Sequence, residues 1–120
     1  MQVTEQETAQ SRLNSDREAT VGQISDLERE FAAIAASAAD GSAGGDDEHD
    51  PEGATVAFER QHVAALLDRA RSHLAAIDAA LLKLAAGRYE ICDICGRPIN
   101  SERLAARPAS LTCIDCAAAR

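Results

Sequence analysis

The chain has 120 residues and a formal net charge of −8, with 20 Asp and Glu against 12 Lys and Arg. Two Phe, one Tyr and no Trp leave little material for a globular aromatic core, and most apolar residues are Ala with spaced Leu and Ile. This composition is typical of long helices that pack closely. The negative net charge argues against unaided binding to a nucleic-acid backbone, which needs clustered Lys and Arg. No apolar run reaches the roughly 20 residues of a membrane span, so we expect no membrane partner.

The N-terminal part of the chain, from about residue 3 to residue 39, predicts one helix. Its apolar residues recur at steps of three and four, the a/d spacing of a coiled coil, with a less regular beginning. They are Leu13, Val21, Ile24, Leu27, Phe31, Ile34 and Ala38. No basic stretch followed by an apolar one opens the chain, so we expect no export signal and a cytoplasmic location.

A glycine-rich acidic segment, around residues 40–52, interrupts this pattern. Its three glycines and one proline break the helix, and Asp50 followed by Pro51 is a good start for the next one. A more regular apolar stripe then runs from about residue 52 to residue 86, and Gly87 is a plausible stop. It comprises Val56, Val63, Leu67, Ala70, Leu74, Ile77, Leu81 and Leu84. Because the connection is short, the helices should be antiparallel neighbours, which predicts a mostly α fold with a long two-helix coiled-coil hairpin over residues 1–87.

The four cysteines form two pairs near the C-terminal end, with the spacing C-x2-C-x17-C-x2-C. This spacing is typical of a four-thiolate zinc site. We therefore expect Cys92, Cys95, Cys113 and Cys116 to hold one structural Zn²⁺ within a small zinc finger over residues 88–120. Four thiolates fill the coordination shell of zinc, and no nucleophile–base pair is apparent, so we expect no enzyme activity.

Other interpretations of the cysteines have less support. Two disulfides would suit a secreted mini-protein, but no export signal is visible. A redox C-x-x-C would need a βαβ setting, which the sequence does not predict. An iron–sulfur cluster stays open, because thiolates alone do not select the metal.

The C-terminal segment resembles the zinc finger of the DksA/TraR family. The residues that carry the resemblance are the run from Gly87 to Gly96, Ile99, Arg103-Leu104, Ala106-Arg107-Pro108 and the run from Cys113 to Cys116. The upstream hairpin with its acidic tip is similar to the coiled coil of the same family. The resemblance implies a transcription regulator that inserts this coiled coil into the secondary channel of bacterial RNA polymerase and modulates initiation. An acidic tip suits a channel lined with basic residues and Mg²⁺.

The resemblance also implies which residues act at the tip. Family members carry Asp-x-x-Asp-x-Ala at the start of the second helix. Here Asp47 and Asp50 have the acidic spacing, and Ala54 follows in a different register. These three residues are therefore the candidate contacts at the tip.

A second set of implied contacts is basic. Arg69, Arg103 and Arg107 are candidate contacts to polymerase or to a ligand, although Arg103 and Arg107 could instead cap the zinc finger. Alanines 76 and 117 occupy the two positions where the family uses basic residues for synergy with ppGpp. We therefore expect weak or absent ppGpp synergy.

Two other functions are compatible with the residues alone. A zinc-stapled coiled coil could be a structural adaptor that pairs with itself or with another protein, whereas a polymerase-binding regulator is expected to be a monomer. Sequence-specific DNA binding through the zinc finger has less support, because its arginines are nearly balanced by acidic residues and no recognition helix is apparent.

Overall fold

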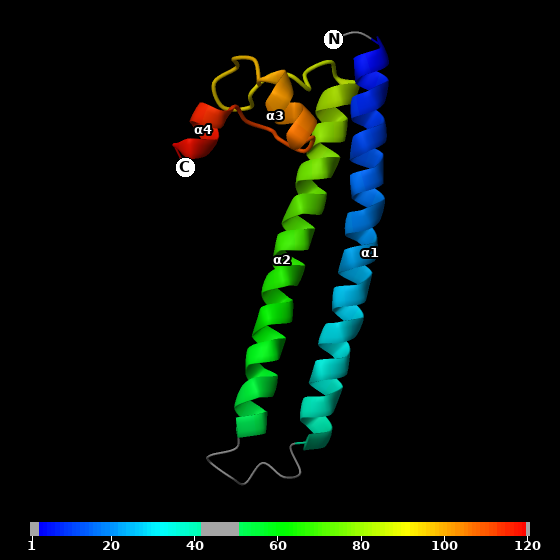
Figure 1. Ribbon diagram of the computed structural model, residues 1–120, viewed down its shortest axis with the longest axis vertical. Helices are drawn as coiled ribbons and strands as arrows, with labels where there is room; N and C mark the ends of the chain where they lie inside the picture. The colour runs from blue at the N-terminus through cyan, green and yellow to red at the C-terminus, as the bar shows by residue number, and fades with distance from the viewer. Residues whose placement is uncertain (1–2, 42–50, 120) are drawn as a thin grey trace. The chain divides into compact units, whose positions relative to one another are not determined.

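The computed structural model describes the backbone of residues 3–41 and 51–119 and the side chains of residues 3–37 and 53–119. Two long helices, α1 (Val3–Gly41) and α2 (Pro51–Ala85), are followed by two short ones, α3 (Ser101–Ala106) and α4 (Ile114–Ala118) (Figure 1). Within these residues no strand forms, and one isolated antiparallel bridge pairs Ile91 with Pro98. The predicted fold class, a mostly helical hairpin followed by a small four-Cys finger, is confirmed.

The chain divides into two compact units, and both long helices contribute to each. The finger unit comprises residues 1–20 and 72–120, and the coil unit comprises residues 21–71. None of the described helices is long and apolar enough to cross a membrane.

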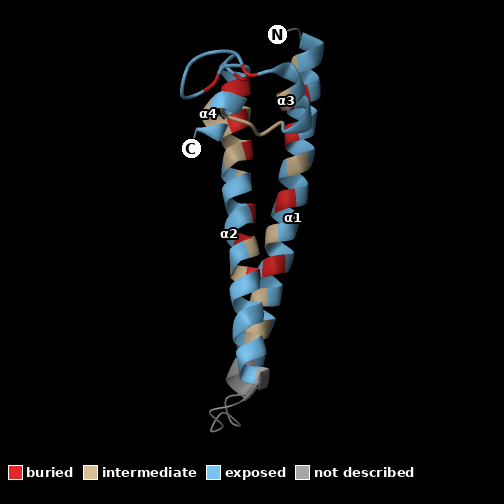
Figure 2. Cartoon of the chain, turned by 60° about the vertical axis from the view of Figure 1, so that its left-hand side comes forward, coloured by how far each residue is buried: buried red, intermediate tan, exposed pale blue. Residues whose placement is uncertain are grey.

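The coil unit has a narrow core along the contact between α1 and α2. Leu27, Val63, Leu67 and Ala70 are buried there, and Ile24, Phe31, Ile34 and Leu66 pack against them. These residues step by three and four along each helix, as the apolar periodicity predicts. Figure 2 shows the buried positions on the sides of the two helices that face each other.

The finger unit has a larger core, because residues after α2 add to the helix contact. Its buried residues are Ala9, Leu13, Ile77, Ala80, Leu84, Tyr89, Cys92, Ile99, Leu104 and Cys113. Side chains from α1, α2, α3 and both cysteine pairs therefore share one cluster. The finger and the adjacent turns of α1 and α2 thus pack around one shared core.

One position of the predicted α1 stripe is wrong. Val21 is 42% exposed, whereas the preceding residue, Thr20, is only 3% exposed. The hydroxyl of Thr20 donates to the carbonyl of Asp16 at 2.7 Å, so this buried polar group is satisfied within its own helix. A search for apolar residues alone could not find a core position filled by a threonine.

The ends of the helices follow local chemistry. After α2, Gly87 has φ +73, and the amide of Arg88 donates to the carbonyl of Lys83 at 2.8 Å. This is the left-handed stop that glycine favours. The side chain of Asn100 caps α3 by accepting from the amide of Glu102 at 2.8 Å, and the helix ends at Ala106, before Pro108. The last helix, α4, begins at Ile114, directly after its N-cap residue Cys113.

Candidate zinc centre

The first cysteine pair lies on a tight turn between α2 and α3. The amide of Cys92 donates to the carbonyl of Arg97 at 2.9 Å, and the amide of Gly96 donates to the carbonyl of Cys92 at 3.0 Å. Gly96 has φ +73, a conformation that costs glycine little and other residues more. The turn therefore folds back on itself and points both sulfurs to one side.

The second cysteine pair lies at the start of α4. Cys113 is the N-cap residue, with extended backbone, and the amide of Ala117 donates to its carbonyl at 3.0 Å. One helical turn then carries Cys116 back beside Cys113. The two pairs thus use different local structures, a loop turn and a helix start, to present two sulfurs each.

The four sulfurs meet in one cluster. The Sγ atoms of Cys92, Cys95, Cys113 and Cys116 all lie within 4.8 Å of one another, and those of Cys95 and Cys113 are 3.7 Å apart. Tetrahedral zinc with bonds of about 2.3 Å needs sulfurs about 3.8 Å apart. All four cysteines are free thiols, so the disulfide interpretation is not supported. The cluster is positioned to bind one metal ion, and soft thiolates suit zinc.

Backbone amides prepare the first pair for metal binding. The pKa of Cys92 is lowered to about 6, mainly because backbone N–H groups, first that of Cys95, hydrogen-bond to its sulfur. The pKa of Cys95 is also lowered, chiefly by the amide of Arg97, which donates to its sulfur at 3.4 Å. Hydrogen bonding to Cys113, together with burial, raises the pKa of Cys116 to about 12. A zinc ion at this site would be bound by thiolates, so its binding would require Cys116 to lose its proton.

Comparison with known proteins agrees with this geometry. Residues 87–120 match the model of the prokaryotic dksA/traR C4-type zinc finger. This segment is a zinc finger of the DksA/TraR family. Four thiolates in such a finger would form a closed, structural zinc site, with no open position for a catalytic water.

Curated relatives and a solved structure extend the likeness. The chain is 45% identical over 49 residues to the RNA polymerase-binding transcription factor DksA of Haemophilus influenzae, and 38% identical over 66 residues to the uncharacterized protein YteA of Bacillus subtilis. These matches cover 41% and 55% of this chain but only 34% and 28% of the relatives. Transcription factor DksA2 from Pseudomonas aeruginosa superposes with a TM-score of 0.74 at 26% identity, over 99% of this chain and 84% of that one. Both DksA proteins are named as transcription factors.

In this DksA/TraR finger, segment 108–112 precedes the second cysteine pair. Hydrogen bonds that its backbone carbonyl groups accept hold this segment in place. The hydroxyl of Tyr89 donates to the carbonyl of Pro108 at 2.7 Å, and Nε of Arg103 donates to the carbonyl of Thr112 at 3.0 Å. The amide of Asp93, between the first two cysteines, donates to the carbonyl of Leu111 at 3.0 Å. Segment 108–112 is irregular, so these bonds replace those of a helix or sheet.

Sequence reasoning missed one residue of the finger unit, Lys83. Its side chain is buried near the end of α2, and its ammonium contacts groups next to both cysteine pairs. The contacts are with two backbone carbonyls and one carboxylate, and a carbonyl has no sequence signature. The available signal was compositional: Lys83 is the only lysine among the 12 basic residues.

The other predicted site residues are not among the four cysteines of the zinc centre. Asp47 and Asp50 lie outside the described residues. Ala54 and Arg69 are exposed on α2, and Arg107 is exposed directly after α3. These described residues are therefore accessible to a partner.

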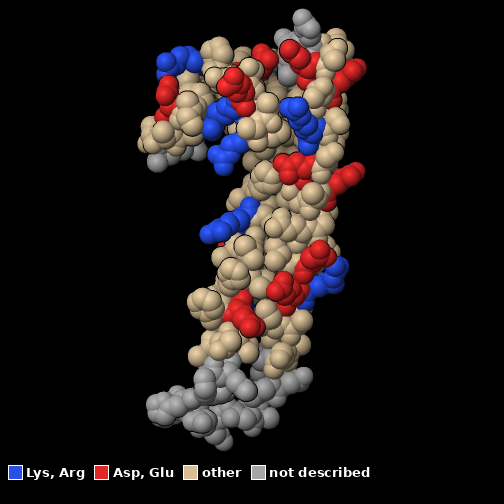
Figure 3. Space-filling model, in the orientation of Figure 1, with Lys and Arg blue, Asp and Glu red and all other residues tan. Residues whose placement is uncertain are grey.

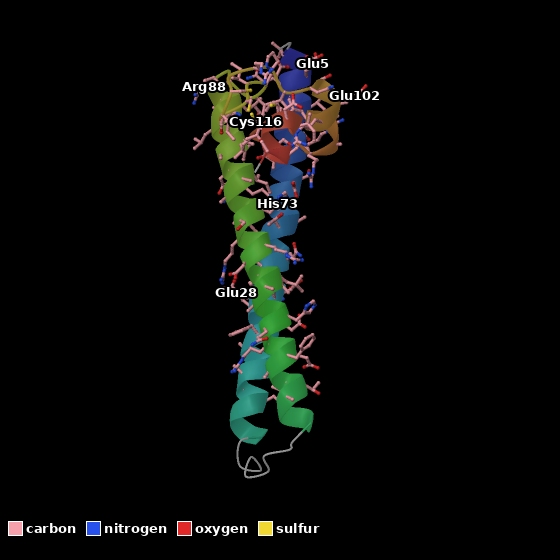
Figure 4. All side chains as sticks on the ribbon, turned by 90° about the vertical axis from the view of Figure 1, so that its left-hand side faces the viewer. Glu5, Glu28, His73, Arg88, Glu102 and Cys116 are labelled. Carbon is pink, nitrogen blue, oxygen red and sulfur yellow. The ribbon has the colours of Figure 1, made fainter. Side chains whose placement is uncertain are left out.

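Polar side chains of α1 and α2 contact each other in both units. In the coil unit, Arg71 of α2 contacts Glu28 of α1 at 3.4 Å. In the finger unit, Nε2 of His73 lies 2.9 Å from a carboxylate oxygen of Asp16. Figure 4 labels His73 on α2, in the finger unit.

Proposed function

We propose that this chain is a zinc-binding transcription regulator that binds bacterial RNA polymerase. The observation that carries the proposal is the likeness to DksA2 over 99% of this chain, together with the family zinc finger at residues 87–120. The H. influenzae relative is named as RNA polymerase-binding. The chain acts as a monomer in the cytoplasm, and its zinc finger is structural.

The proposed mechanism places the coiled-coil hairpin in the secondary channel of polymerase. The acidic segment at residues 40–52 enters first, and Asp47, Asp50 and Ala54 modulate initiation from there. Negative charge at this end suits a channel that holds Mg²⁺ and basic side chains. In this proposal the hairpin comprises residues 1–87 and the zinc finger comprises residues 88–120.

Basic residues on the described surface supply further contacts. Arg69 and Arg107 are exposed and free to contact polymerase or a ligand, whereas the guanidinium of Arg103 is already bound to Thr112. The positions of Ala76 and Ala117 lack a cation, so the response to ppGpp is weak or absent.

Direct DNA binding is not part of the proposal. On the face seen in Figure 3, basic side chains of the described residues lie among acidic ones instead of forming one basic patch. With a net charge of −8, the chain lacks the electrostatic attraction that phosphate contacts require.

The decisive experiment is co-purification with polymerase in a reducing, zinc-replete lysate, followed by transcription in vitro with and without ppGpp. Asp50→Asn and Asp47→Asn should bind polymerase nearly as well as the wild type but alter initiation less. Glu18→Gln, which removes an exposed acid from the finger unit, is the matched control and should behave as wild type. Absence of binding would overturn the proposal, and equal transcription by all variants would remove the tip from the mechanism.

One observation favours the adaptor as a second candidate. Phe58 on α2 is 72% exposed, and a large exposed aromatic side chain is typical of a contact surface. An adaptor that pairs through this face should sediment as a concentration-dependent oligomer, and Phe58→Ser should make it monomeric. A wild-type chain that is monomeric at all concentrations would exclude self-pairing.

A further inference from the structure

The side chain of Lys83 is the least expected buried group in the chain. The residue is 5% exposed, although an ammonium is among the groups that are most costly to remove from water. The chain has 12 Lys and Arg residues, and all of them except Lys83 are arginines. The one lysine of this chain is therefore found at an interior position.

Three acceptors surround the Lys83 ammonium. Its Nζ lies 2.6 Å from the carbonyl oxygen of Ile91, 3.3 Å from that of Leu111 and 3.0 Å from Oδ1 of Asp93. An ammonium has three N–H donors and no acceptor, so this set satisfies all of them. Arginine could not replace it well, because a planar guanidinium directs its donors into a fixed fork.

The three acceptors of the Lys83 ammonium belong to the segments that position the cysteine sulfurs. Ile91 directly precedes Cys92, Asp93 directly follows it, and Leu111 comes two residues before Cys113. The amide of Asp93 donates to the same Leu111 carbonyl, at 3.0 Å, so the two segments also contact each other there. The ammonium is therefore fully paired only when both segments lie side by side, which is also the arrangement that brings the four sulfurs together.

We propose that Lys83 is a positioning residue for the zinc centre, which links metal binding to the end of α2. With the ammonium in place, both cysteine pairs are preorganised for the ion. With the ion bound, the two segments cannot separate, so the ammonium keeps its partners. Because coupling between two equilibria is reciprocal, Lys83 strengthens zinc binding and zinc strengthens the burial of Lys83. This link does not depend on binding to polymerase.

A purely structural role would have a different signature. A lysine that only tied α2 to the finger would stabilise the fold to the same extent with or without zinc. Its removal would lower the thermal stability but leave zinc affinity unchanged. Zinc affinity therefore separates the two roles, and lysine accessibility tests whether the link between Lys83 and the metal exists at all.

The first experiment measures zinc affinity by competition with a chromophoric chelator. Lys83→Met keeps the length of the side chain and removes the ammonium, and it should weaken zinc binding by about 10- to 100-fold, as loss of outer-shell partners of metal ligands does. Arg88→Met is the matched control, because it removes an equal charge from an exposed residue (Figure 4) and should leave affinity unchanged. Zinc affinity of Lys83→Met equal to that of the wild type would overturn the proposal.

The second experiment uses the native chain and does not rely on folding of a variant. Lys83 is the only lysine, so an amine-acylating reagent with site-resolved mass spectrometry reports its accessibility directly. Acylation of Lys83 should be at least about tenfold slower in the zinc-loaded protein than after chelation, because the buried amine reacts only when the site opens. The Arg88→Lys variant adds an exposed reference lysine that should react at one rate in both states. Equal rates at Lys83 with and without zinc would overturn the proposal.

Discussion

The finger unit and the coil unit are built on the same two helices but are stabilised by different interactions. In the coil unit, α1 and α2 hold together through one stripe of apolar residues, with Leu27, Val63, Leu67 and Ala70 buried. In the finger unit the same helices also pack against Tyr89 and the cysteine pairs, and Lys83 binds backbone groups. The difference shows that a helical hairpin with few aromatic residues can obtain a large core at one end from a short finger that follows it.

The largest effect should come from removing the metal. Chelation of zinc, or Cys113→Ser, should abolish protection of amides 89–118 from hydrogen exchange, because zinc binding supplies on the order of 10 kcal/mol in finger peptides. Amides 22–37 and 53–70 of the coil unit should change much less, since no cysteine lies among them. Exchange measured by mass spectrometry checks this, and equal loss of protection in both units would show that they unfold together.

The next largest difference should be in the free energy of unfolding lost when one core side chain is truncated in each unit. Ile77 is fully buried and Leu67 is 5% exposed. Ile77→Ala should cost about 3–4 kcal/mol of the free energy of unfolding, and Leu67→Ala about 2, because the partly exposed neighbours of Leu67 can close the space it leaves. Chemical denaturation measures both.

Leu82→Ala provides the control for these truncations. Leu82 is 73% exposed on α2, so its removal should change stability by less than about 0.5 kcal/mol. A larger loss for Leu67→Ala than for Ile77→Ala would contradict the comparison between the two cores.

Regular patterns explain why the sequence predicted most of this arrangement. Apolar spacing predicted both long helices, and cysteine spacing predicted the metal cluster, because each pattern involves side chains that must face one partner. The carbonyl contacts of Lys83, Tyr89 and Arg103 could not be predicted, since their acceptors belong to the backbone of an irregular segment. Thr20 was missed because its hydroxyl is satisfied locally, so a polar residue occupies a core position.

Alkaline pH should act on the finger unit through Tyr89. Burial raises the pKa of this phenol above its ordinary value of 10.0, and the nearby Arg12 guanidinium offsets part of the rise. The neutral phenol is therefore favoured by folding. Its contribution to stability is complete below pH 10 and is lost as the pH rises from 10 through the pKa of the folded state.

Absorbance can measure this ionisation directly, because Tyr89 is the only tyrosine and the chain has no tryptophan. The zinc-loaded protein should titrate above pH 10, and a midpoint at or below 10 would contradict the burial of the ring. Tyr89→Phe removes the hydrogen bond to the Pro108 carbonyl and should cost about 1 kcal/mol at neutral pH. In this variant, the loss of stability above pH 10 should be smaller than in the wild type.

Ion pairs between α1 and α2 should have the smallest effect on the free energy of unfolding, and this effect should be nearly equal in the two units. Arg17 and Asp78 are 2.8 Å apart in the finger unit, and Arg71 and Glu28 are 3.4 Å apart in the coil unit, with all four side chains about half exposed. Asp78→Asn and Glu28→Gln should each cost about 0.5 kcal/mol or less at low salt, because water and side-chain entropy offset most of the attraction. In 1 M salt, where screening acts within about 3 Å, the cost should vanish in thermal unfolding. If Asp78→Asn cost about 2 kcal/mol or more and this cost persisted in 1 M salt, the finger unit would also depend on ion pairs between its helices. The stability of the finger unit could then not be assigned to zinc, apolar packing and carbonyl contacts alone.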